Sequence, residues 1–137
     1  MNMSRIHYSK TPFNYNSSKK YKNNNYLKPD GLWYSLGDSW KKWVHENLNS
    51  DRVKYETEII FHNKNILKIY PNDVPEFYFK YGFKYKKFKL INWKQVKKDY
   101  DGIEFPNYSD DHIFQKIYTF YNIIDIPCGC IWAPLNL

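Results

Sequence analysis

Apolar and polar side chains alternate with a period of two in several short stretches of the chain, a pattern that predicts β-strands. The longest such stretch covers residues 53–61, in which Val, Tyr, Thr, Ile and Phe occupy every second position between mostly charged neighbours. An Asn-Lys-Asn turn signal at residues 63–65 separates it from a second apolar stretch at residues 66–70. We therefore expect these two strands to form a β-hairpin.

Other short segments also predict strands, and turn-forming residues border several of them. A Pro-Asp-Gly sequence at residues 29–31 indicates a tight turn, because proline fixes φ and glycine accepts positive φ. The preceding residues 11–28 are rich in Asn, Ser, Lys and Tyr without a sustained period, which indicates a flexible connection. The expected strands are residues 5–9, 32–35, 103–105 and 129–132.

After residue 38 the apolar positions repeat with the helical period of 3.6. Asp38 is a candidate N-cap, and we expect the helix that follows it to cover residues 39–48. The apolar positions fall on one face, so we expect burial of the stripe formed by Trp40, Trp43, Val44 and Leu48.

Further helices are expected later in the chain. Residues 74–81 are aromatic-rich and follow a Pro-Asn-Asp turn, and residues 93–100 follow Asn92, a candidate N-cap. The basic, aromatic residues 84–90 between them are interpreted as a connection. A last helix is expected from Asp110 or Asp111 to about residue 121.

Strands and helices are intermixed along the chain without regular β-α-β alternation, which favours an α+β fold with a mostly antiparallel, bent or split sheet and several short helices. The length of 137 residues fits a single domain over residues 1–137. Aromatic residues make up 20% of the chain, which is enough apolar surface to offset the entropy of ordering it. No apolar run has membrane-spanning length and no apolar leader is present, so we expect a soluble, intracellular protein without a membrane partner.

The net charge of +7 admits a nucleic-acid partner, because clustered cations bind phosphate backbones. Lysines and aromatic residues are interleaved over residues 80–89, which would pair phosphate contacts with base stacking. In this alternative the protein is a basic, aromatic nucleic-acid-binding module with contacts from Lys84, Lys86 and Lys87. All but two of the 21 cationic side chains are lysines, however, and such an excess is also typical of a solvated surface.

The two cysteines, Cys128 and Cys130, are separated by one residue. On a strand this spacing places both side chains on one face, in a geometry that a disulfide cannot bridge without strain. The histidines at positions 7, 45, 62 and 112 show no spacing typical of metal ligands, so no metal site is predicted. We expect two buried, reduced cysteines on a strand.

Three segments taken together resemble the split NAD site of the ADP-ribosyltransferase superfamily. Residues 7–9 (His-Tyr-Ser) resemble the His-Tyr-Thr strand that opens many of these domains, and residues 31–35 (Gly-Leu-Trp-Tyr-Ser) resemble the second core strand. Residues 101–103 (Asp-Gly-Ile) resemble the Tyr-Asp-Gly-Ile run that precedes the late strands. The resemblance implies an ADP-ribosyltransferase-like fold over nearly the whole chain and a transferase that uses NAD as its substrate.

The same resemblance implies roles for individual residues. Glu104 would be the catalytic carboxylate that stabilises positive charge on the ribose as the nicotinamide–ribose bond breaks. Arg5 or His7 would bind a phosphate or ribose of NAD, and Tyr34 would stack on the nicotinamide ring. Ser35 would orient its neighbours through a hydrogen bond.

Several alternatives stay open in the sequence. Many arginine-modifying members of the family carry a Glu-x-Glu pair, whereas the nearest acid upstream of Glu104 is Asp101, which argues against arginine as the acceptor. The acceptor of ADP-ribose is then another group on a protein, a nucleic acid or water. A noncatalytic interaction domain of the same fold is a further interpretation. Considered singly, Glu104 could instead be a solvated surface residue, and His7 could make a structural hydrogen bond.

Overall fold

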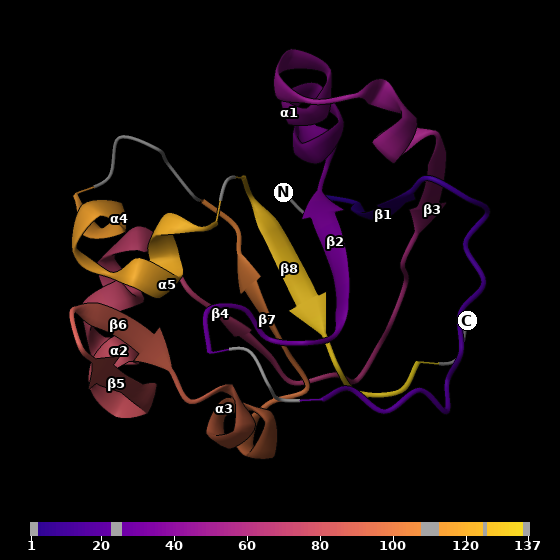
Figure 1. Ribbon diagram of the computed structural model, residues 1–137. Coiled ribbons are helices and arrows are strands. Elements are labelled where there is room, and N and C mark those ends of the chain that lie inside the picture. The colour runs from indigo at the N-terminus through magenta and orange to yellow at the C-terminus, as the bar shows by residue number, and fades with distance from the viewer. Residues whose placement is uncertain (1–2, 23–25, 108–112, 125, 136–137) are drawn as a thin grey trace.

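Six short strands form the main sheet of the computed structural model, in the order β3-β1-β2-β8-β7-β4 (Figure 1). The structure describes residues 3–22, 26–107, 113–124 and 126–135. These residues form a small α+β domain with a mostly antiparallel sheet and several short helices, which confirms the fold class expected from the intermixed pattern. The strands are β1 Arg5–Ser9, β2 Leu32–Leu36, β3 Tyr55–Glu58, β4 Ile66–Lys68, β7 Gly102–Phe105 and β8 Cys128–Ile131.

Neighbouring strands of this sheet are antiparallel except β4 and β7, which pair in parallel at one edge. The hairpin expected over residues 53–70 is wrong, because β3 and β4 lie at opposite edges of the sheet. β3 pairs with β1, and the chain then crosses to the far edge, where β4 pairs with β7. The alternating pattern identifies a strand with one buried face, but it does not specify the neighbouring strand.

The helices begin and end close to their expected positions in the first part of the chain. Asn92 caps α3 as predicted, since its side-chain oxygen accepts a hydrogen bond from the Gln95 backbone N–H at 3.3 Å. The last expected helix is divided in two, because Tyr118 has an extended backbone. Its candidate caps, Asp110 and Asp111, lie outside the described residues. The helices are α1 Ser39–Asn47, α2 Val74–Tyr81, α3 Trp93–Asp99, α4 Phe114–Ile117 and α5 Thr119–Asn122, with 3-10 turns η1 Ser50–Val53 and η2 Pro71–Asp73.

The stripe expected to be buried on α1 is only partly covered. Val44 is fully buried, whereas Leu48 is 40% exposed. Trp40 and Trp43 are half-buried and stack on each other, with ring centroids 5.1 Å apart. Asp38 precedes the helix without a side-chain capping bond, and its carboxylate instead lies 3.5 Å from the ammonium of Lys42.

Side chains of the central strands alternate between two apolar clusters, one on each face of the sheet. Ile103, Phe105 and both cysteines of β8 belong to the larger cluster, which also contains residues of α2, α3 and α5. Tyr34 and Ile131 belong to the smaller cluster. Phe13, from the connection before β2, packs against that smaller cluster. The cysteines are buried with free thiols, so their predicted position on a buried strand face is confirmed.

The connection expected at residues 84–90 is instead a second, two-stranded sheet. β5 Gly82–Tyr85 and β6 Phe88–Ile91 form an antiparallel hairpin beside α2 (Figure 1). Its two-residue turn is Lys86-Lys87, which differs from the Asn-Gly or Asp-Gly sequences that mark such turns. Among the described residues, no helix is long and apolar enough to cross a membrane.

Candidate functional site

One carboxylate links three strands of the main sheet. Glu104 on β7 accepts a hydrogen bond from the Tyr34 hydroxyl on β2 at 2.6 Å. The same oxygen, Oε2, accepts a hydrogen bond from Nε of Arg5 on β1, also at 2.6 Å, and this contact is an ion pair. Glu104 is only 3% exposed, so the interpretation of this residue as solvated surface is wrong. The structure thus brings together three of the residues expected in the site, and we call Arg5, Tyr34 and Glu104 the carboxylate triad.

Gly129 on β8 makes the contact between Tyr34 and Glu104 possible. It lies directly between these two residues in the register, opposite Tyr34 on one side and Glu104 on the other. A Cβ atom at this position would lie 2.6 Å from Cε2, Cζ and the hydroxyl of Tyr34. The tyrosine ring therefore crosses the glycine to reach a carboxylate two strands away.

The negative charge of Glu104 raises the pKa of both of its partners in the triad. Burial and then the negative charge of Glu104 raise the pKa of Tyr34, so its hydroxyl keeps the proton that it donates. Burial alone would lower the pKa of Arg5, but the hydrogen bond and charge of Glu104 outweigh it and the net shift is upward. The Arg5 guanidinium also lies 4.5 Å from the ring centroid of Phe61, a cation–π contact. The buried carboxylate is thus paired with a cation and a neutral donor.

A cavity of about 300 Å³ lies beside β1, β2 and β8. Its floor contains three side chains that lie opposite one another on β1, β2 and β8, namely Ile6, Ser35 and Cys128. Successive side chains of a strand point to opposite faces, so Ser35 and Tyr34 lie on different sides of β2. Tyr34 and His7 also line the cavity, so it borders one member of the carboxylate triad as well as Ser35.

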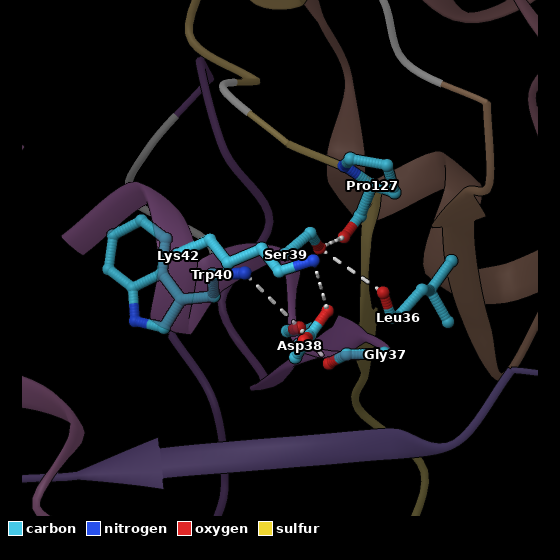
Figure 2. Close-up of polar contacts among 8 residues, drawn as sticks. Leu36, Gly37, Asp38, Ser39, Trp40, Lys42 and Pro127 are labelled. Atoms are coloured by element: carbon cyan, nitrogen blue, oxygen red, sulfur yellow. Dashed lines mark hydrogen bonds and ion pairs between the residues drawn. The ribbon is translucent and has the colours of Figure 1, made fainter. Parts of the chain in front are cut away.

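Ser35 and Ser39 fix the start of α1 beside this cavity. The Ser35 hydroxyl donates to the Gly37 carbonyl oxygen at 2.6 Å and accepts from the Trp40 backbone N–H at 3.5 Å. Figure 2 shows the Ser39 hydroxyl directed at two carbonyl oxygens, those of Leu36 and Pro127, each at 3.2 Å. These bonds join the end of β2, the first turn of α1 and the segment that leads into β8.

His7 borders the cavity and shares a strand face with Arg5. Its Nδ1 lies 2.7 Å from the Trp33 carbonyl oxygen, and its ring centroid lies 4.5 Å from that of Phe13. A tautomer with the proton on Nδ1 would donate this bond. The structural hydrogen bond considered for His7 is therefore present.

Some parts of the arrangement were not foreseen in the sequence. Gly129 could have been noticed because a glycine inside a strand often marks a close approach of another group. Lys68, which lies opposite Glu104 in the parallel register of β4 and β7, is exposed and carried no local signal. Lys84, Lys86 and Lys87 lie on the separate β5–β6 hairpin.

No group of three or more His, Cys, Asp or Glu side chains within the described residues is arranged to hold a metal ion. Comparisons with protein-family models, with curated proteins and with solved structures find no match. Function is therefore inferred from the geometry of the chain.

Proposed function

We propose that this protein is an NAD-cleaving, ADP-ribosyltransferase-like enzyme in which Glu104 is the catalytic carboxylate. The observation that carries the proposal is the convergence of Arg5, Tyr34 and Glu104 on one carboxylate oxygen. These residues come from the three separate segments whose order resembles the NAD site of that superfamily. A buried carboxylate flanked by a cation and a tyrosine suits this chemistry because its charge is held in a fixed position.

In the proposed reaction the bond between nicotinamide and ribose breaks, and its electron pair leaves with the nicotinamide nitrogen. The ribose is left with oxocarbenium character, and the negative charge of Glu104 stabilises this developing positive charge. An acceptor hydroxyl, amine or water then forms a bond to the same ribose carbon and loses a proton. Tyr34 positions Glu104 through its hydroxyl, which replaces the stacking role expected for its ring.

NAD would approach the triad from the side of Arg5. The Arg5 side chain is 29% exposed, whereas that of Glu104 is 4% exposed. Lys68 adds an exposed cation beside Glu104 in the sheet register. Both cations fit the phosphates of a dinucleotide, and Arg5 offers paired N–H donors for this purpose.

The decisive experiment compares NAD binding and nicotinamide release by the wild-type protein and Glu104→Gln, with cell extract supplied as a source of acceptors. Glutamine keeps a side-chain carbonyl that can accept from Tyr34 but removes the negative charge. We expect release to fall by at least about 100-fold while circular dichroism shows a folded protein. Glu76→Gln, the same change on the exposed surface of α2, is the matched control and should leave release unchanged.

Unchanged release by folded Glu104→Gln, or absence of NAD binding by the wild type, would refute the proposal. A second candidate is a noncatalytic domain of the same fold, favoured by the 3% exposure of Glu104 and its engagement by two donors. In that case the triad fixes the arrangement of β1, β2 and β7, and the wild type binds NAD without releasing nicotinamide.

A further inference from the structure

The tip of the β5–β6 hairpin presents cations and aromatic rings side by side. Tyr85 and Phe88 lie directly opposite each other on the two strands and are 58% and 41% exposed. The two turn residues between them fold back on these rings. The ammonium of Lys86 lies 5.6 Å from the ring centroid of Tyr85, and that of Lys87 lies 5.8 Å from the ring centroid of Phe88. We call these four residues, together with Lys84, the hairpin tip.

Two features of the β5–β6 hairpin lower its stability. Lys84 lies directly opposite Lys89 in the antiparallel register, and like charges in this position repel each other. Lys86 has a φ of 55°, in the left-handed region that glycine and asparagine adopt more readily than lysine. Both features lower the stability of the hairpin, and a role in binding would account for them.

The lysines of the hairpin lack acidic partners within the part of the chain that the structure describes. The ion pairs found there join Arg5 to Glu104, Lys41 to Glu56 and Lys42 to Asp38. Lys84, Lys86 and Lys87 are exposed and available to an anionic partner, whereas the Lys89 ammonium lies 4.9 Å from the ring centroid of Tyr118. An acidic partner would also relieve the repulsion between Lys84 and Lys89.

We propose that the hairpin tip binds single-stranded nucleic acid. Tyr85 and Phe88 would stack with bases that a duplex keeps paired, and Lys84, Lys86 and Lys87 would contact phosphates. The exposed aromatic pair favours a single strand over a duplex. A duplex keeps its bases stacked inside and exposes its phosphates, so the two rings would have no base to stack on. The inference does not depend on the NAD chemistry proposed for the carboxylate triad, which lies on the other sheet.

The test is fluorescence polarisation with labelled oligomers of deoxyuridine and of uridine about 12 nucleotides long, using the full chain at several salt concentrations. The variant Lys84→Gln with Lys87→Gln should bind at least about 10-fold more weakly, and the dependence of log affinity on log salt should become shallower by about 1.4, or about 0.7 for each phosphate that is no longer neutralised. The charge-matched control is Lys94→Gln with Lys98→Gln, on exposed positions of α3, and it should bind like the wild type. Stronger binding to uridine than to deoxyuridine would identify RNA as the source, and the reverse would identify DNA, because the two oligomers differ only in the 2′-hydroxyl.

Two further variants separate binding from folding. Lys86→Gly removes a charge but relieves the positive φ, so we expect a higher melting temperature together with weaker binding. Tyr85→Ala with Phe88→Ala should weaken binding while the salt dependence stays the same, because stacking is abolished and the phosphates are still neutralised.

Three results would overturn the inference. Equal losses of affinity in the hairpin variant and the α3 control would show that binding reflects overall charge. Equal affinity for a duplex of the same length would exclude recognition by stacking. Binding of polyglutamate with the same affinity and the same sensitivity to Lys84 and Lys87 would identify an acidic protein as the partner.

Discussion

At the residue scale, the carboxylate triad depends on one side chain that crosses a strand. The Tyr34 ring reaches from β2 over Gly129 on β8 to Glu104 on β7. A buried carboxylate that loses a partner keeps most of its desolvation cost, so each contact of the triad contributes to stability. Two substitutions test these contacts separately.

The first is Tyr34→Phe, which removes only the hydroxyl that donates to Glu104. Hydrogen bonds to charged groups contribute about 1.5–3 kcal/mol, so we expect the free energy of unfolding to fall by about 2 kcal/mol. Urea denaturation followed by circular dichroism measures this change. Tyr85→Phe makes the same chemical change on an exposed ring and should alter stability by no more than about 0.5 kcal/mol. Equal effects of the two variants would show that the Tyr34 hydroxyl is energetically unimportant.

The second substitution is Gly129→Ala, whose Cβ would lie 2.6 Å from atoms of the Tyr34 ring. Overpacking of this kind costs about 1–3 kcal/mol, because the ring must shift away from Glu104. The double variant Gly129→Ala with Tyr34→Leu lacks the ring and should lose less stability than the sum of the two single changes. The coupling, measured by urea denaturation, should be at least about 0.5 kcal/mol. Strictly additive effects would contradict the crossing of Gly129 by Tyr34.

Part of the carboxylate triad could be predicted from the sequence. Arg5, Tyr34 and Glu104 were expected in one site because the three segments that contain them resemble a known NAD site. The burial of Glu104 was missed, because its partners are 70 and 99 positions away along the chain and the local sequence shows only an acid after a turn. Only the register of β2, β8 and β7 reveals that a glycine separates Tyr34 from Glu104.

At the element scale, Asp101 ties the β4 edge of the sheet to its interior. Its carboxylate accepts a hydrogen bond from the Asn65 backbone N–H at 2.7 Å, and its backbone N–H donates to the Asn65 carbonyl oxygen at 2.8 Å. Its carbonyl oxygen accepts from the backbone N–H groups of Trp132 and Ala133. One residue thus connects the turn before β4, the start of β7 and the end of β8.

Asp101→Ala removes the carboxylate and leaves the backbone bonds in place. We expect stability to fall by about 1 kcal/mol, with the effect concentrated at the β4 edge. Hydrogen exchange should show this as faster exchange of the Ile69 amide, which donates to the Glu104 carbonyl oxygen at 2.8 Å. The amides of the β5–β6 hairpin serve as an internal control and should exchange at their wild-type rates. A uniform increase across both sheets would mean that Asp101 supports the whole fold instead of one edge.

The positions of strands and helices were easier to predict from the sequence than the pairing of the strands. β1, β2 and β7 and helices α1 to α3 match their expected positions closely, because caps, turns and periodicity are local signals. The hairpin of residues 53–70 failed because pairing depends on distant strands. The β5–β6 hairpin was missed because its turn, Lys86-Lys87, has none of the usual turn residues.

At the scale of the whole molecule, tyrosines with a raised pKa make the stability of the fold depend on pH in the alkaline range. Burial is the main cause that raises the pKa of several of them, and the pKa of Tyr121 rises to about 12. Burial also raises the pKa of the Cys130 thiol, which acts in the same direction, whereas burial lowers the pKa of Lys97, which acts in the opposite direction. The tyrosines outnumber it, and the ones with a raised pKa are Tyr8, Tyr21, Tyr34, Tyr78, Tyr81 and Tyr121.

We therefore expect stability to fall as the pH rises above about 10, the pKa of an unperturbed tyrosine. In that range the unfolded chain releases protons that the folded tyrosines retain, so each further rise in pH favours the unfolded state. The stabilising contribution is complete below about pH 9 and declines until the folded tyrosines themselves ionise. Urea midpoints measured from about pH 8 to about pH 11 follow this decline, and Tyr34→Phe should make it shallower, because it removes a buried hydroxyl whose pKa is raised. A midpoint that stays constant up to about pH 11 would mean that these hydroxyls ionise as readily in the folded protein as in the unfolded chain, which is incompatible with a buried Tyr34 donating to Glu104.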